Sequence, residues 1–127
     1  MWQDVDATHQ LHPATLLDYV EECGNQVLIA YGWPIARMMQ EGFAIIMRRM
    51  RVEFVQPIRL DDELTIATWA AEFKRISAVR YYRFMRASDH ALVARAHALG
   101  VWLNTATLQP IRLPPHFLAD FAPNIVV

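Results

Sequence analysis

Apolar residues recur at intervals of three and four along residues 13–31, which is typical of an amphipathic helix. The set comprises Leu16, Leu17, Val20, Cys23, Val27, Leu28 and Tyr31. Pro13 suits the first helical position, and Pro34 cannot continue a helical ladder. The pattern therefore predicts one long helix from Pro13 to Tyr31. A short turn of helix is predicted over 35–40, and Gly42 then opens a different pattern.

After Gly42 the period changes to an alternation of apolar and polar residues, which predicts β-strands. One face of the first strand is expected to carry Ala44, Ile46, Met50, Val52 and Phe54, opposite Arg49, Arg51 and Glu53. Three further strands are predicted over 63–73, 76–86 and 92–103, with a hairpin turn at 87–90. Because the links are short, we predict an antiparallel meander followed by an extended segment over 109–115.

Small residues alternate along one face of the last predicted strand. They are Ala94, Ala96, Ala98 and Gly100. Such a row leaves a trough in which another backbone can approach closely, and the long helix is its expected occupant. We therefore predict an α+β fold in which a curved antiparallel β-sheet wraps around one long central α-helix. The uncovered sheet edges favour a dimer.

Composition narrows the classes of function. The chain has 127 residues, enough for one domain, and 54% of them are hydrophobic, which favours a largely buried helix or a large subunit interface. A net charge of −1 without a basic run argues against nucleic-acid binding. No apolar run is long enough for a membrane span, and no signal pattern is present, so a cytoplasmic location is expected. The single Cys23 excludes an internal disulfide and a multi-cysteine metal site.

An acidic turn with two histidines directly precedes the long helix. It places Asp4, Asp6, His9 and His12 beside the free N–H groups of a helix start, the parts that attack on a polarised carbonyl requires. Asp6 is the strongest catalytic candidate, with a turn-forming role as its alternative. Asp4 is expected to be structural or solvated. His9, His12 and Asp6 have metal-ligand chemistry, but their spacing matches no familiar metal site, so no metal is predicted.

Motifs in a recognisable order cover nearly the whole chain. They begin with Asp4-x-Asp6-Ala7, the stretch from His9 to Pro13, and Leu17-x-Tyr19-x-Glu21-Glu22. They continue with Arg51-Val52-Glu53-Phe54, the stretch from Pro57 to Ile66, Arg80-x-Tyr82-x-Phe84-x-Arg86, the stretch from Leu92 to Ala96, Val101-Trp102-Leu103, and the stretch from Pro110 to Pro114. In this order and spacing the chain resembles the hotdog-fold thioesterases of the 4-hydroxybenzoyl-CoA thioesterase and acyl-CoA thioester hydrolase group.

The resemblance implies that residues 1–127 form a single hotdog thioesterase-like domain that hydrolyses acyl-CoA or acyl-carrier-protein thioesters without a metal or other cofactor. Asp6 matches the family's catalytic carboxylate, which acts as nucleophile or as general base. The N–H groups at the helix start would form the oxyanion hole, and the residues expected to supply it or to position the substrate are His9, His12, Ala14 and Thr15. The resemblance also implies a homodimer or homotetramer with active sites at subunit interfaces.

The chain departs from the family pattern around the start of the helix. Thr8-His9 stands where a glycine is usual, and His12-Pro13 replaces asparagines. Pro13 has no N–H, so a donor must come from Ala14, Thr15 or a neighbouring turn residue. Only Met1-Trp2-Gln3 precede the acidic motif, so we expect a shortened first strand. These departures leave open a non-catalytic acyl-thioester binding or regulatory module, and more distantly a hotdog dehydratase or hydratase.

Other side chains have both a functional and an ordinary interpretation. Trp33, Met38, Met39 and Phe43 could line an acyl pocket, with core packing as the alternative. The strand arginines Arg80, Arg83 and Arg86 could bind CoA phosphates, although solvated strand residues are the commoner outcome. The helix carboxylates Asp18, Glu21 and Glu22 are expected on a solvated or interface face, and His97 on the strand face opposite the trough.

Overall fold

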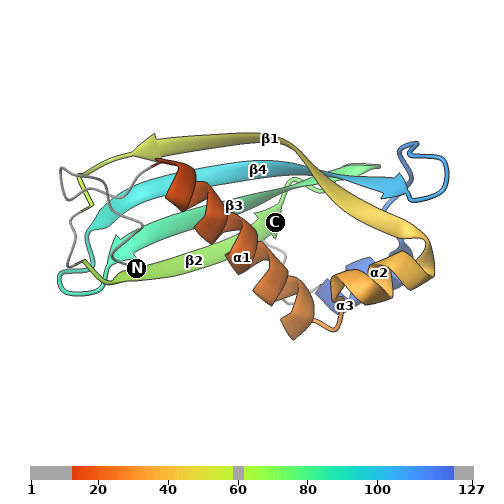
Figure 1. Cartoon of the computed structure of the whole chain (residues 1–127), viewed down its shortest axis with the longest axis horizontal. Helices are drawn as coiled ribbons and strands as arrows, with labels where there is room; N and C mark the ends of the chain where they lie inside the picture. The colour runs from red at the N-terminus through yellow and green to blue at the C-terminus, as the bar shows by residue number, and fades with distance from the viewer. Residues whose placement is uncertain (1–12, 59–61, 122–127) are drawn as a thin grey trace.

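The computed structural model describes residues 13–58 and 62–121, with side chains from Val20 onward. The elements are α1 (Pro13–Ala30), α2 (Ile35–Glu41), β1 (Phe43–Phe54), β2 (Leu64–Ala71), β3 (Ser77–Arg86), β4 (Leu92–Asn104) and α3 (Pro115–Phe121). All four strands form one antiparallel sheet, and α1 lies across one of its faces (Figure 1). This arrangement confirms the predicted α+β fold with a curved sheet around one long helix.

The strand order corrects the predicted meander. Strands β2, β3 and β4 follow one another as expected, but β1 pairs with β4, giving the order β1-β4-β3-β2. The N–H groups of Val55 and Gln56 both donate to the Val93 carbonyl, at 2.9 and 3.1 Å. The chain therefore stays beside β4 as it leaves β1, and it then crosses to the opposite edge of the sheet to start β2. The link from Phe54 to Leu64 is longer than a hairpin turn, which permits this crossing.

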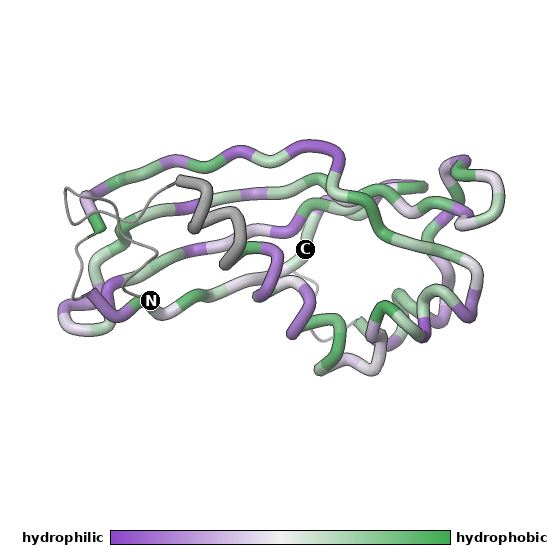
Figure 2. Tube along the Cα trace, in the orientation of Figure 1, coloured by the Kyte–Doolittle hydropathy of each residue, from purple (hydrophilic) through white to green (hydrophobic). Residues whose placement is uncertain are grey.

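A β-bulge makes the predicted apolar face of β1 wrong in its first half. The pairing with β4 shifts between Met47 and Arg49, so one extra residue changes which side chains point inward. Ile45 consequently lines the inner face, whereas Ile46 is 47% exposed on the outer one. Beyond the bulge Met50 packs against the core, as the alternation predicted. Figure 2 shows hydrophilic and hydrophobic residues alternating along the strands.

The predicted trough of small residues forms the centre of the core. Ala94, Ala96 and Ala98 are buried on the inner face of β4, and Val20 of α1 is packed in the same cluster. Helix and sheet approach closely here, since a Cβ added to Gly24 would lie 3.3 Å from the hydroxyl oxygen of Tyr82. The small side chains therefore allow α1 to lie against the sheet, as expected from the sequence.

A second core cluster joins α2 and α3 to the end of the sheet. The extended segment is confirmed, because Pro110 bridges to Leu103, but the helix that follows it, α3, was not predicted. In this helix Phe117 packs at 5.3 Å from Trp33, measured between ring centroids. The signal was present in the sequence, since Pro115 suits a first helical position and Phe117 and Phe121 are four residues apart.

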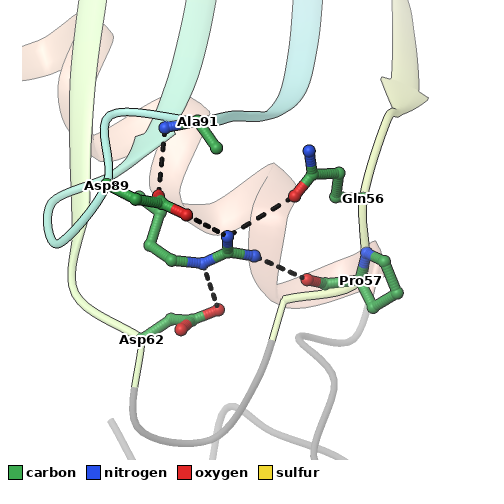
Figure 3. A network of polar contacts seen from close by, with 6 residues as sticks. Gln56, Pro57, Asp62, Asp89 and Ala91 are labelled. Atoms are coloured by element: carbon green, nitrogen blue, oxygen red, sulfur yellow. Dashed lines mark hydrogen bonds and ion pairs between the residues drawn. The ribbon is translucent and has the colours of Figure 1, made fainter.

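Arg86 connects the β1–β2 crossover to the β3–β4 hairpin, and the partners that it contacts are labelled in Figure 3. Its guanidinium lies 3.0 Å from the Asp89 carboxylate in the hairpin turn and 3.3 Å from the Asp62 carboxylate at the end of the crossover. It also donates to the side-chain oxygen of Gln56 at 3.4 Å and to the carbonyl of Pro57 at 3.3 Å. Hydrogen bonds to Asp89 and then Asp62 raise the pKa of Arg86. Both connections at this end of the sheet are therefore tied together.

Candidate active site

A cavity of about 340 Å³ lies between α1 and the sheet face that it covers. The helix contributes Val20, Gly24 and Leu28, and all four strands contribute side chains to the opposite wall. Phe117 and Phe121 of α3 line one part of it. A volume of this size is at the lower end of the range for ligand pockets, and it suits a group smaller than a whole coenzyme.

The cavity exists because small residues meet on facing elements. Ala98 and Gly100 of β4 line it on the sheet side, and Gly24 lines it on the helix side. A Cβ added to Gly100 would lie only 3.1 Å from Cγ2 of Ile45, so even one methyl group is crowded at this point. The row of small residues on β4 therefore has two effects. It lets α1 lie close to the sheet near Val20, and it leaves an unfilled space farther along the helix.

Among the residues that the structure describes, Arg80 is the one arginine on the wall of this cavity. It lies on the inner face of β3, opposite Ala98, and is half-buried. Its Nη1 donates to Oγ1 of Thr68 at 3.1 Å, and within residues 20–58 and 62–121 it makes no ion pair. Burial lowers the pKa of Arg80, although an arginine remains charged in proteins. The interpretation of Arg80 as a solvated strand residue is therefore wrong.

Three further polar groups lie in the region of the cavity. Tyr82 is 4% exposed, and burial raises the pKa of its phenol to about 12. Like any tyrosine hydroxyl it is protonated at neutral pH and can donate a hydrogen bond. Burial likewise raises the pKa of the half-buried Cys23 thiol. On the cavity wall the indole N–H of Trp102 is buried and has no hydrogen-bond partner in the described part of the chain.

The start of α1 bears on the predicted oxyanion hole. The helix begins at Pro13, as predicted, so the N–H groups of Ala14 and Thr15 lie in its first turn. The first N–H groups of an α-helix have no intrahelical acceptor and are free to bind a ligand oxygen. Asp6, His9 and His12 lie outside the described residues.

The residues proposed for an acyl pocket do not meet at the cavity. Trp33, Met38 and Phe43 are buried together in the second core cluster, and Met39 is 56% exposed. The indole N–H of Trp33 donates to Asp120 at 2.9 Å, which fixes it to α3. In the structure Trp33, Met38 and Phe43 hold α2 and α3 against the sheet. The described cavity lining comes from α1, the strands and α3.

The sequence named Arg80 only as a candidate for CoA phosphates and did not name Tyr82, although the pattern carried a signal for the burial of both residues. Arg80 and Tyr82 lie on the same face of β3 as Ala78 and Phe84. Because Ala78 and Phe84 are buried, this is the apolar face of the strand. An arginine on an apolar strand face is a candidate for a buried charge with a specific role. By contrast, Arg83 and His97 are exposed on the outer face of the sheet. On α1 Glu22 is exposed, and Glu21 is exposed but also contributes to the cavity lining.

Comparison with known proteins shows the family. A model of the thioesterase-like superfamily matches residues 1–121. The chain belongs to the thioesterase-like superfamily. This confirms the resemblance noted in the sequence and the predicted class of enzyme, a thioester hydrolase.

Relatives agree with this assignment. The acyl-CoA thioester hydrolase YbgC of Escherichia coli O6:H1 is 28% identical over 120 residues, which cover 94% of this chain and 89% of that protein. A 1,4-dihydroxy-2-naphthoyl-CoA thioesterase from Synechocystis has the same fold, with a TM-score of 0.85, 17% identity and coverage of 94% and 88% of the two chains. A putative oleoyl thioesterase from Lactobacillus plantarum gives a TM-score of 0.89 at 19% identity, with 99% of this chain matching 49% of that one.

Neither a candidate metal cluster nor a membrane-spanning helix occurs among the described residues. No group of three or more histidine, cysteine or acidic side chains is arranged to hold a metal ion within that part of the chain. Among the same residues no helix is long and apolar enough to cross a membrane.

Proposed function

We propose that the protein hydrolyses acyl-CoA thioesters, with the acyl group in the cavity beneath α1 and the reacting carbonyl at the start of that helix. The observation that carries the proposal is the cavity itself, which is lined mainly by small and apolar residues and runs along the helix whose first turn offers N–H donors. Membership of the thioesterase-like superfamily supports the reaction class.

In the proposed mechanism Asp6 accepts a proton from water as the water oxygen attacks the thioester carbonyl carbon. The N–H groups of Ala14 and Thr15 stabilise the oxyanion that develops on the carbonyl oxygen, and His9 and His12 position the substrate. Collapse of this intermediate breaks the C–S bond, and the thiolate takes up the proton. The products are a carboxylic acid and free CoA. Asp6 could instead attack directly, forming an anhydride that water then opens.

The proposal extends to assembly and to the carrier of the acyl group. A homodimer or homotetramer is supported by β1, which ends the strand order and exposes Ile46, Met47 and Phe54. Edge strands with apolar side chains are common sites of association between subunits. Acyl-carrier-protein thioesters are a second proposed substrate, since the reaction involves the same thioester carbonyl.

A thiol-release assay tests the function directly. We expect Asp6→Asn to lower kcat by about 100-fold or more, because it removes the proton acceptor or nucleophile. Asp4→Asn is the matched control and should behave as the parent protein. Aromatic and aliphatic acyl-CoAs, and one acyl-carrier-protein thioester, should be assayed with each protein. Parent-level hydrolysis by Asp6→Asn across this panel would show that the assignment of Asp6 is wrong.

The position of Pro13 favours one alternative function, a module that binds acyl thioesters without hydrolysing them. As the first residue of α1 it supplies no N–H, so the oxyanion hole has one donor fewer than an ordinary helix start. A protein that binds acyl-CoA tightly in calorimetry, but releases no thiol from any substrate, would be the non-catalytic binding module and not the hydrolase.

A further inference from the structure

The guanidinium of Arg80 has unused hydrogen-bonding capacity inside the cavity. Arginine carries five N–H donors, and among the described residues the hydrogen bond to Thr68 is the only one that Arg80 makes. A half-buried charge without an ion-pair partner is costly, and a bound anion would offset that cost. The Thr68 hydroxyl also holds the guanidinium against the sheet. The Arg80 side chain therefore loses less conformational entropy when a ligand binds.

Tyr82 supplies a second donor beside Arg80. The two residues are two positions apart on the same face of β3, which places their Cβ atoms about 7 Å apart. The Tyr82 hydroxyl lies against α1 at Gly24, and it has no hydrogen-bond partner within the described ranges. A nearly buried hydroxyl in this position can donate to the same anion that the guanidinium binds.

We propose that Arg80 and Tyr82 bind a carboxylate at the far end of the acyl group, which makes ω-carboxyacyl-CoA thioesters the preferred substrates. This inference rests on the proposed function, because it assumes that the thioester carbonyl lies at the start of α1. The fork of an arginine matches the two oxygens of a carboxylate, and the remaining wall is apolar enough for a methylene chain.

Distance and charge favour the acyl carboxylate over a phosphate of CoA. The Tyr82 hydroxyl lies against Gly24 of α1, nine positions after Thr15, or about 14 Å along the helix axis. An acyl chain that leaves the carbonyl can span this distance, while the CoA portion leaves the carbonyl in the other direction. Glu21 also contributes to the lining and disfavours an anion of higher charge. A single carboxylate therefore fits Arg80 better than a diphosphate.

Matched substrate pairs test the inference. Hexanoyl-CoA is compared with adipoyl-CoA, and decanoyl-CoA with sebacoyl-CoA, by kcat/KM from thiol release. We expect the parent protein to prefer the carboxylated member of at least one pair by about 10- to 100-fold, as hydrogen bonds to a charged group allow. Arg80→Met should abolish this preference while retaining hydrolysis of the uncharged member. Arg80→Lys should keep part of it, because the charge remains but the fork is lost.

Control variants separate recognition from folding. Arg95→Met removes an exposed arginine from the outer face of the neighbouring strand and should leave the preference unchanged. Tyr82→Phe keeps the buried ring and should reduce the preference several-fold, so it serves as the test if Arg80→Met does not fold. A parent protein that hydrolyses the uncharged member faster in both pairs would overturn the inference, as would an equal loss on both members in Arg80→Met.

Calorimetry with free sebacate distinguishes this inference from the proposed function. Binding that the parent protein shows and Arg80→Met lacks would support carboxylate recognition, even if no thioester were cleaved and the proposed function had failed. Cleavage of uncharged acyl-CoAs without any sebacate binding would overturn the inference and leave the proposed function standing.

Discussion

Two phenylalanines in one row of the sheet provide a controlled test of how α1 and the sheet form the core. Phe84 on β3 and Phe54 on β1 both pair with Ala94 of β4, one on each side. Phe84 is 0% exposed, whereas Phe54 is 44% exposed. We expect Phe84→Ala to lower the free energy of unfolding by about 3–5 kcal/mol, since it removes a fully buried ring and leaves a cavity. Phe54→Ala should cost about 1 kcal/mol.

Urea unfolding at 25 °C, followed by circular dichroism at one protein concentration, measures both costs. The two variants should keep the m-value of the parent protein, because the surface exposed on unfolding hardly changes. For a chain of this length the loss in Phe84→Ala corresponds to a fall in Tm of about 10–20 °C. A cost for Phe54→Ala equal to that for Phe84→Ala would refute the reasoning, because half of the Phe54 side chain would then not be open to water. So would a cost below about 1 kcal/mol for Phe84→Ala.

Two further outcomes follow from the cavity. Gly100→Ala adds a methyl group 3.1 Å from Cγ2 of Ile45, so we expect a several-fold lower kcat/KM for long acyl-CoAs than for short ones, and an equal effect at all chain lengths would contradict it. Because the pKa of Tyr82 is raised to about 12, the folded state holds this proton longer than the unfolded state, and stability should fall as the pH rises from about 10 towards 12. Tyr82→Phe should flatten this fall in urea titrations at several pH values, and an unchanged slope would contradict the assignment.

The sequence was sufficient for most of the elements and for the packing of helix on sheet. The three-and-four spacing gave α1 to within one residue at its end, and Ala94, Ala96 and Ala98 identified the face it covers. Both signals are local, because they depend on residues within one element. The crossover to β2 was not predictable in this way, since the choice of partner for β1 is decided by residues far apart in the chain.

The candidate site was harder to predict, because the role of each residue depends on which face of its strand it occupies and on how deeply its side chain is buried. The bulge beside Arg48 reverses the alternation of β1, and nothing in the local pattern marks it. Trp33 and Met38 have the composition of a pocket, but the unpredicted α3 covers them and makes them core. Arg80 shows the opposite error. Because it is charged, it was expected to be solvated, but it lies on the strand face that α1 covers.

The pairing of β1 with β4 also affects how the chain is synthesised. Ribosomes add about 5–20 residues per second, so the chain from Phe54 to Asn104 takes about 3–10 s to make. Through that interval β1 has no strand to pair with, and its first half carries Ile45 and Ile46 in an apolar run. Charged residues that flank such a run oppose aggregation of nascent chains. Arg48, Arg49 and Arg51 follow this run in the same strand, which is where such charges would oppose aggregation until β4 emerges.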